Sequence, residues 1–357
     1  MRMIKTCTLI LGLLFSAASS PAANVVLVAG GGSLDQGKAT EVRLGAPFGA
    51  AFDEHGNMFL VEMTGQQVRK VDPQGILTTV AGLGSKGDAG DGGPATKAQF
   101  NGMHSLAVLP NGDVLVADTW NNRVRKIDAK SGSIANLAGV GTKGFSGDGG
   151  PASKAEFGGI YCVALNPKGD RLYLADLDNR RVRMVDLKSG RVKTIAGNGQ
   201  AGVPHDGAEA VEAPLMDPRA VCADDSGNVY ILERNGNALR VVNAKGKIRT
   251  VVGTGIKGLS GDGGDALKAT LNGPKHLCVD REGNVIIADT ENHVVRKYLP
   301  RDGKIVRVAG SGRKGKAGLD GSPERLEMNQ PHGVYVHPSG TLYICDSGNN
   351  RVLKIVE

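Results

Sequence analysis

Six residues of unlike chemistry recur along this chain at intervals of 56 to 58 residues. Together they supply one hydrocarbon ring, two imidazoles, a phenol, a guanidinium and an ammonium group. They are Phe48, His104, Tyr161, Arg219, Lys275 and His332. Cationic and hydrogen-bonding side chains of this kind bind anionic or polar ligands. If the repeat places all six at equivalent positions around one axis, they form a ligand-binding ring.

Two members of this ring, His104 and His332, are metal-ligating residue types, and His276 lies one position beyond Lys275. Imidazole nitrogens bind Zn²⁺, so these three histidines are the candidates for a divalent metal site. A third histidine at an equivalent position of the repeat is missing. The alternative interpretation of the ring is the ordinary polar lining of a water-filled channel.

An acidic residue follows the second apolar run of every repeat. The series is Glu62, Asp118, Asp176, Glu233, Asp289 and Asp346. A ring of carboxylates can bind a cation, but an Asp that ends a strand can also accept N–H groups of the following turn. Arginines five to seven residues later, such as Arg125 after Asp118, are placed to pair with it. Presence in every repeat favours the structural role.

A second acidic series lies in glycine-rich segments between the repeats. It consists of Asp35, Asp91, Asp148, Asp206, Asp262 and Asp320. Turns of the type Gly-Asp-Gly-Gly are similar to the oxygen-rich turns that hold Ca²⁺. Each segment offers only one or two carboxylates, however, which is fewer than Ca²⁺ usually takes. Ca²⁺ binding and stabilisation of a turn by the Asp side chain both stay open at this point.

These residues are carried by six repeats, of which the clearest begins at Met103. Matching units begin at Pro47, Ile160, Pro218, Pro274 and Pro331. Each unit has a short apolar run, a turn with glycine, a second run, a polar turn, a third run and a fourth run ending in Ala-Gly or Val-Gly. Four short strands joined by turns are typical of one propeller blade. No segment has a sustained 3.6-residue period, so we expect little helix.

The two ends of the chain predict a closed ring. The last repeat stops at Glu357 after its third run, and residues 24–30 match the missing fourth run. Pairing of 24–30 with 350–356 would complete the last blade and leave no open edge. We therefore predict an all-β fold, a six-bladed β-propeller of four-stranded blades closed by the N-terminal strand. The six ring residues then lie at the mouth of the central channel, on the face that carries the long loops.

Residues 1–23 are typical of a secretory signal peptide, with Arg2 and Lys5 before a short apolar stretch and cleavage near Ala22 or Ala23. Residues 24–357 then form a single propeller domain that is secreted or periplasmic. The formal net charge of +7 falls to +5 without Arg2 and Lys5, which does not demand a polyanionic partner. No later apolar stretch approaches the roughly 20 residues of a membrane span.

The motifs and their order resemble the NHL repeat family, most closely its exported bacterial members. The resemblance rests on Gly-Asp-Gly-Gly-Pro-Ala, Gly-Asn-x-x-x-Ala-Asp and Asn-Asn-Arg-Val-Arg-Lys, and it covers residues 24–357. Repeats 1 and 4 depart from it in the polar turn, where they have Glu62-Met-Thr-Gly-Gln and Glu233-Arg-Asn-Gly-Asn. The resemblance implies a propeller that serves as a binding platform, because such propellers bind proteins, RNA or small ligands.

Some related six-bladed enzymes, such as the peptide-amidating lyases, bind zinc through histidines and place a Tyr and an Arg at the channel mouth. This similarity implies Tyr161 and Arg219 as the candidate catalytic residues if the protein is an enzyme. A metal-dependent lyase or lactone hydrolase is therefore the alternative function, and a divalent metal, Zn²⁺ or Ca²⁺, is its candidate cofactor.

The preferred hypothesis is an exported, non-catalytic binding platform. It would hold a protein or a small polar ligand through its loop-rich face and its channel mouth. Export and the scarcity of aromatic residues, 4% of the chain, argue against nucleic acid as a partner. We expect a monomer.

Overall fold

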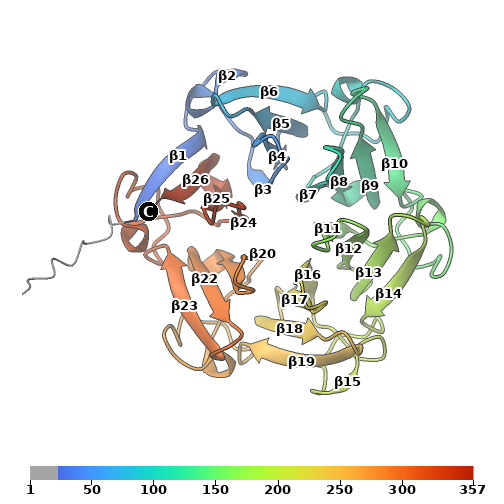
Figure 1. Ribbon diagram of the computed structural model, residues 1–357, viewed down its shortest axis with the longest axis vertical. Helices are drawn as coiled ribbons and strands as arrows, with labels where there is room; N and C mark the ends of the chain where they lie inside the picture. Colours follow the sequence, from blue (N-terminus) through green and yellow to red (C-terminus); the bar gives the residue numbers. More distant parts are fainter. Residues whose placement is uncertain (1–22, 357) are drawn as a thin grey trace, which may run out of the picture.

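Six antiparallel sheets surround a central axis, with the first strand of each repeat innermost (Figure 1). This computed structural model describes residues 23–356. The sheets are called blades 1 to 6, in the order of the repeats that supply their inner strands. The predicted six-bladed all-β propeller is confirmed. The signal peptide predicted for residues 1–23 lies almost wholly outside the described residues.

The strands of blades 1 to 3 follow the predicted runs closely. Blade 1 contains β3 (Pro47–Phe52), β4 (Met58–Glu62), β5 (Gln67–Val71) and β6 (Ile76–Ala81). Blade 2 contains β7 (Ser105–Val108), β8 (Val114–Asp118), β9 (Arg123–Ile127) and β10 (Ile134–Ala138). Blade 3 contains β11 (Ile160–Leu165), β12 (Arg171–Asp176), β13 (Arg181–Asp186) and β14 (Val192–Ala196).

The other three blades repeat this order. Blade 4 contains β16 (Pro218–Ala223), β17 (Val229–Glu233), β18 (Ala238–Val242) and β19 (Lys247–Val252). Blade 5 contains β20 (His276–Val279), β21 (Val285–Asp289), β22 (Val294–Leu299) and β23 (Lys304–Ala309). Blade 6 contains β24 (Gly333–Val336), β25 (Leu342–Asp346), β26 (Arg351–Val356) and β1 (Asn24–Gly30).

Helical structure among residues 23–356 is limited to short 3-10 turns. They are η1 (Ala39–Glu41), η2 (Ala95–Lys97), η3 (Thr119–Asn121), η4 (Ala152–Lys154), η5 (Ala266–Lys268), η6 (Thr290–Asn292), η7 (Pro323–Arg325) and η8 (Ser347–Asn349). No helix in this part of the chain has the length and apolarity needed to cross a membrane.

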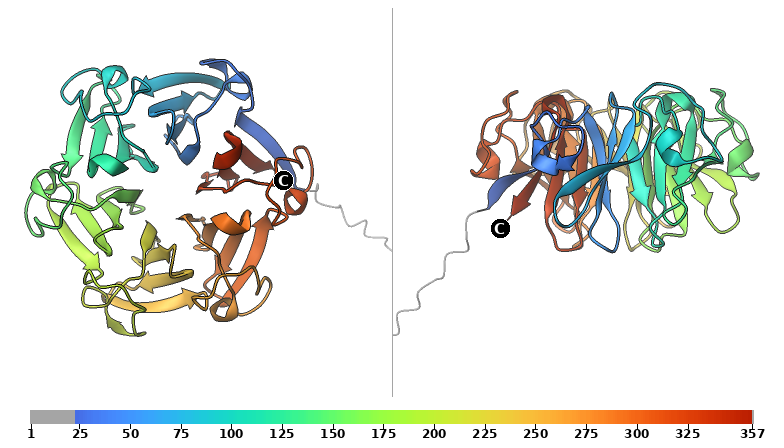
Figure 2. Two further views of the ribbon diagram at one scale, coloured as in Figure 1. Left: turned by 180° about the vertical axis from the view of Figure 1, so that it is seen from behind. Right: turned by 90° about the horizontal axis from the view of Figure 1, so that it is seen from above.

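The ring closes as the chain ends predict. Strand β1 pairs antiparallel with β26, and Val25 lies opposite Ile355. Val25 also exchanges backbone hydrogen bonds with the loop of the same blade, donating to Gly321 O at 3.0 Å and accepting from Asp320 N at 2.8 Å. Figure 2 shows β1 beside the C-terminal strand when the ring is seen from behind and edge-on.

Blades 1 and 4 differ from the predicted four strands. A two-residue strand on the outer edge gives each a fifth, β2 (Gly37–Lys38) in blade 1 and β15 (Ala208–Glu209) in blade 4. In blades 2, 3 and 5 the corresponding loop makes only an isolated bridge, such as Pro94 with Ser133. The two blades whose sequences depart from the repeat thus also differ in their loop structure.

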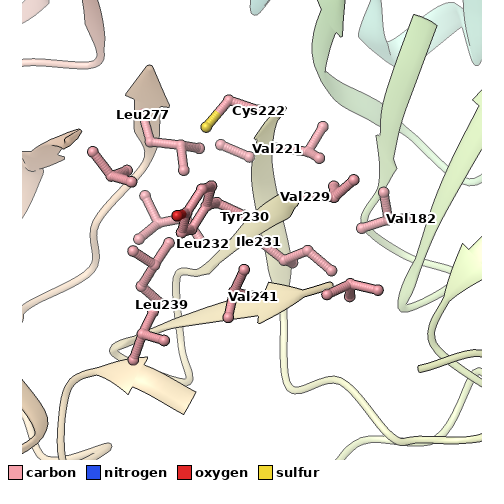
Figure 3. Close-up of a cluster of buried hydrophobic side chains, with 14 of the residues drawn as sticks. Val182, Val221, Cys222, Val229, Tyr230, Ile231, Leu232, Leu239, Val241 and Leu277 are labelled. Atoms are coloured by element: carbon pink, nitrogen blue, oxygen red, sulfur yellow. The ribbon is translucent and has the colours of Figure 1, made fainter. Parts of the chain in front are cut away.

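The hydrophobic core lies between neighbouring blades, because both faces of each sheet are covered. The middle strands are therefore nearly continuous apolar runs, and every residue of β17 is buried. In Figure 3, Val229 of β17 points toward Val182 of blade 3, while Tyr230 points toward Leu277 of blade 5. Side chains of one strand thus join three blades in one packed cluster.

The long loops and the turns between second and third strands lie on the same face, as the connectivity predicts. In blade 2 the backbone N–H of Trp120 in the turn donates to Asn101 O in the loop at 3.1 Å. The side chain of Asn121 donates to Gly87 O at 2.7 Å. This loop-rich face surrounds the end of the channel that we call the mouth.

Candidate functional site

A backbone turn precedes each ring residue and directs the chain into the inner strand. In five blades the residue two positions earlier has a left-handed backbone, with φ between 51° and 78°. Its N–H donates to a side chain of the preceding blade, as Gly102 donates to Gln66 Oε1 at 2.9 Å. The other four bonds run from Gly159 to Asn122, Gly273 to Asn237, Gln330 to His293 and Ala46 to Asn350. We call these five contacts the inter-blade latches.

Blade 4 lacks a latch. Arg180 of blade 3 occupies the accepting position, with φ of 48°, and no amide or imidazole is present there. Asp217, two residues before Arg219, binds Arg234 through its carboxylate at 2.8 Å instead. Arg219 is therefore positioned differently from the other five ring residues.

Five of the six ring residues are in direct contact. Phe48 stacks on His332 with ring centroids 3.8 Å apart, and it meets His104 edge-on at 5.0 Å. His104 packs against Tyr161 at 4.7 Å. The guanidinium carbon of Arg219 lies 4.5 Å from the centre of the Tyr161 ring. The structure thus gathers these five side chains into one cluster at the channel mouth.

The sixth residue, Lys275, joins the cluster through two side chains. Its Nζ lies 2.6 Å from Glu291 Oε1, and Gln330 Nε2 donates to the other oxygen of Glu291 at 2.8 Å. Gln330 O in turn lies 2.9 Å from His332 Nδ1. All six predicted residues therefore line one connected site.

Both imidazoles of the cluster are neutral at pH 7. His104 Nδ1 lies 2.6 Å from Gly102 O, and a carbonyl can only accept, so Nδ1 carries the proton and Nε2 is an acceptor. His332 makes the same contact with Gln330 O. Burial lowers the pKa of both residues well below the ordinary value, and the charges of Lys275 and Arg219 add to this effect.

Among the described residues, no carboxylate forms an ion pair with Arg219, because the nearby Asp217 binds Arg234 instead. The Arg219 side chain is buried, with 4% of the residue exposed, and its hydrogen bond among the described residues is from Nη1 to Tyr161 O at 3.3 Å. Burial lowers its pKa to about 10, which leaves it protonated at neutral pH. Because a buried charge is costly without an opposite charge, this side chain is poised for an anionic partner.

The three histidines named as metal candidates do not form a metal centre. Phe48 is in ring contact with both His104 and His332. His276 faces the channel, and its Nδ1 accepts the N–H of Val334 at 3.4 Å. Within residues 23–356, no three or more His, Cys, Asp or Glu side chains are grouped so as to hold a metal ion. As placed among residues 23–356, the three histidines therefore do not fit a bound metal.

The channel wall below the mouth is lined mainly by apolar side chains. It encloses a cavity of about 340 Å³, lined mainly by Ala, Val, Leu and Cys side chains from the inner strands. Cys162 and Cys222 are buried in this wall without a disulfide. Polar groups of the site are therefore concentrated at the mouth.

The recurring acids and arginines form structural clusters. In blade 2, Arg125 Nε and Nη2 donate to Asp91 Oδ1 at 3.0 and 2.8 Å, and Arg125 Nη1 lies 3.7 Å from Asp118 Oδ2. Asp118 also accepts the backbone N–H of Asn101 at 2.8 Å. The pairs Arg183–Asp148 and Arg296–Asp262 repeat this arrangement in blades 3 and 5. The strand-end acids thus stabilise turns, and these three loop carboxylates bind arginine.

Two residues of the mouth, Glu291 and Gln330, were not predicted from the sequence. Trp120 also lies at the mouth. Trp120 is 43% exposed and packs edge-on against His104 at 5.6 Å. Glu291 and Trp120 occupy equivalent positions in the turns of blades 5 and 2. This position differs in all six repeats, which is the same kind of asymmetry in the sequence that marks the ring residues.

Comparison with known proteins supports the repeat assignment. The family model described as "NHL repeat" matches residues 100–127, 271–298 and 328–355, which span the first three strands of blades 2, 5 and 6 to within one residue. Two relatives are Protein SUPPRESSOR OF QUENCHING 1, chloroplastic, of Arabidopsis thaliana, 24% identical over 284 residues, and NHL repeat-containing protein 2 of Gallus gallus, 27% identical over 303 residues. Each alignment covers 76% of this chain, but 27% and 41% of the relative, so the chain spans less than half of these proteins.

Solved structures share the fold at low identity. A structural genomics protein of unknown function from Bacteroides thetaiotaomicron superposes with a TM-score of 0.69 at 18% identity, and an auxiliary nutrient binding protein from the same organism with 0.68 at 16%. Both superpositions cover 94% of this chain and 76% of the other. Streptogramin B lyase gives a TM-score of 0.54 at 11%, covering 94% and 98%. These likenesses concern the fold alone, whereas the three matched segments show that the chain contains NHL repeats.

Proposed function

We propose that this protein is an exported, non-catalytic binding module that holds a small anionic ligand at the channel mouth. The observation that carries the proposal is the buried guanidinium of Arg219, which has no carboxylate partner among the described residues. A planar guanidinium donates two parallel hydrogen bonds to a carboxylate or phosphate, which makes such an anion its natural partner.

The surroundings of Arg219 favour the same ligand class. The Tyr161 ring packs against the guanidinium of Arg219. Lys275 adds a second cation to the site, and its partner Glu291 also accepts a hydrogen bond from Gln330. The neutral imidazoles of His104 and His332 present unprotonated Nε2 atoms to the cluster. An anion placed here would favour protonation of these rings, so its binding would be accompanied by proton uptake.

The proposal can be tested by calorimetric titration with acetate, succinate, citrate, inorganic phosphate and D-galacturonate. We expect at least one of these anions to bind the wild type. Arg219→Gln should weaken the binding of that anion about tenfold or more, since the hydrogen bond from the charged guanidinium is lost. Arg234→Gln is the matched control, because Arg234 already pairs with Asp217 at 2.8 Å. Equal affinities of wild type and Arg219→Gln, or no binding of any of the five anions, would overturn the proposal.

A further inference from the structure

Blade 1 contains a polar pocket that is separate from the channel. Its volume is about 500 Å³, which is within the range of small-molecule sites and far above the roughly 30 Å³ share of one water. It lies where the loop after β1 meets strands β4, β5 and β6. Side chains from all of these segments line it: Asp35, Arg43, Glu62, Gln67, Arg69 and Thr79.

A paired substitution opens this space. Four blades have Asp at the end of the second strand and Asn three residues later, and the Asn amide donates both to the Asp and to a loop glycine carbonyl, as Asn121 does to Asp118 and Gly87. Blade 1 has Glu62 and Gly65 at these positions. A Cβ on Gly65 would lie 2.2 Å from Glu62 Oε2, so the longer acid requires the glycine.

The loop that precedes β3 is also shorter than its counterparts, which leaves a second part of the pocket unfilled. The step from the glycine after the fourth strand to the start of the next repeat is 21 residues in blade 2, from Gly82 to Met103, but 17 in blade 1, from Gly30 to Pro47. Blades 3 to 6 all have the longer step. The missing residues belong to the part of the loop that contains Gly87 in blade 2, whose carbonyl receives the Asn121 amide.

Two buried polar atoms of the pocket have no hydrogen-bond partner among the described residues. They are Oε1 of Glu62, a residue 2% exposed whose carboxyl lies near the backbone N–H of Gly45, and Nε of Arg69, which is 4% exposed. In blades 2, 3 and 5 the loop Asp binds this arginine, but here Asp35 is held by Arg43 Nη2 at 2.7 Å. Arg69 instead bonds Gln67 Oε1 at 3.0 Å and Asp35 O, and its Nη1 lies 3.7 Å from Glu62 Oε2.

Blade 4 shows that the Glu–Gly pair alone does not leave atoms unpartnered. It has Glu233 and Gly236 with a loop of full length. Glu233 Oε1 accepts from Met216 N at 2.8 Å, and Oε2 accepts from Arg240 Nε and Nη2 at 2.9 and 2.7 Å. The unpartnered atoms of blade 1 therefore result from the pair combined with the shorter loop.

We propose that the blade 1 pocket binds a small neutral polyol, such as a monosaccharide. A hydroxyl group donates and accepts at once, so one hydroxyl can donate to Glu62 Oε1 while it or a neighbouring hydroxyl accepts from Arg69 Nε. The amide of Gln67 and the hydroxyl of Thr79 add further polar contacts in the wall. The ligand completes the hydrogen bonding that the other blades complete with protein.

The charges of the pocket favour a neutral ligand over an ion. Two guanidinium groups, Arg43 and Arg69, are balanced by two carboxyl groups, Asp35 and Glu62. An anion would face Glu62 and a cation would face Arg69, and each would leave one buried atom unsatisfied. This site is independent of the channel mouth, where Arg219 is uncompensated.

The test is calorimetric titration of the full mature protein with D-glucose, D-galactose, L-arabinose and myo-inositol. We expect at least one to bind, and the double variant Glu62→Asp/Gly65→Asn to weaken it about tenfold or more by refilling the space with the pair found in four other blades. The matched control, Glu233→Asp/Gly236→Asn in blade 4, should leave the affinity unchanged. Arg219→Gln should also leave it unchanged, which separates this site from the channel mouth.

Thr79→Leu provides a second variant, which narrows the pocket from β6, where Thr79 lies opposite Arg69 of β5, and it too should weaken binding. A pocket that holds only water would bind none of the four polyols, and that result overturns the proposal. Binding that survives both blade 1 variants, or that is lost equally in the blade 4 control, would also overturn it.

Discussion

At the scale of single residues, a buried arginine has a structural role where a carboxylate pairs with it and is a candidate binding residue where none does. Arg125 and Arg219 are both buried, but Arg125 donates to Asp91 and to backbone carbonyls, whereas Arg219 has one carbonyl. Removal of one member of a buried ion pair leaves an uncompensated charge. The pair that Arg125 forms therefore stabilises the loop. Arg219 has its charge already uncompensated, which is why it marks a site.

Titration of His276 should make the stability of the fold depend on pH. Burial lowers the pKa of this ring to about 4, and the charge of Arg219 acts in the same direction. The unfolded chain therefore binds the proton more tightly, and the stability present above the unfolded pKa of about 6.5 is lost as pH falls toward about 4.

We expect wild type to lose about 2 kcal/mol relative to His276→Leu between pH about 7.5 and about 5. Denaturant unfolding of both proteins at each pH measures this difference. The buried acids, such as Asp118 with its pKa raised to about 6, act in the opposite direction but are present in both proteins and cancel. Parallel pH profiles of the two proteins would show that His276 titrates normally.

At the scale of elements, the turn between second and third strands connects each blade to the next. Its last residue has a left-handed backbone in all six blades, and in five of them the side chain accepts an N–H from the following blade. The bond holds the chain two residues before the ring residue. Blade stability and the geometry of the channel mouth are thus linked through one contact.

Loss of the latch at the ring junction should destabilise the protein. Asn350→Gly keeps the left-handed backbone accessible but removes the acceptor for Ala46 N at 2.9 Å, and we expect a cost of about 1 kcal/mol. Chemical denaturation measures the change. Arg180→Gly is the matched control, since Arg180 has the same backbone region without a latch, and an equal cost in both variants would refute the role of the bond.

At the scale of the whole molecule, closure by β1 joins the two ends of the chain in one sheet. Val25 is fully buried between blades 5 and 6, while Val26 on the opposite face of the strand is partly exposed. In a closed ring each blade is covered on both faces by its neighbours, and only short sheet edges remain. Damage to the closing strand should therefore affect the entire fold.

A charge at the closing strand tests this expectation. Val25→Asp places a carboxylate in an apolar cluster and should lower Tm by on the order of 5 °C or more, whereas Val26→Asp should have a much smaller effect. Calorimetric melting of the two variants gives the comparison. A Tm unaffected by Val25→Asp, or a second transition that leaves the rest of the ring unchanged, would contradict cooperative closure.

The number of blades, their strands and the closure by residues 24–30 could be predicted because they depend on local patterns. Apolar alternation, turn glycines and the repeat length are present in each segment, and six copies in register define the equivalent positions. The same register identified Phe48, His104, Tyr161, Arg219, Lys275 and His332 as neighbours, and the structure brings them together.

Tertiary structure alone decided which partners these residues have. The uncompensated Arg219, the stacking of Phe48 on His332 and the link from Lys275 through Glu291 to Gln330 depend on contacts across blades. The pocket at Glu62 depends on a four-residue difference in one loop and on a glycine that admits a longer acid. Such contacts form between segments far apart in the chain. The position in the repeat therefore specifies where a side chain lies, but not which atoms form its hydrogen bonds or balance its charge.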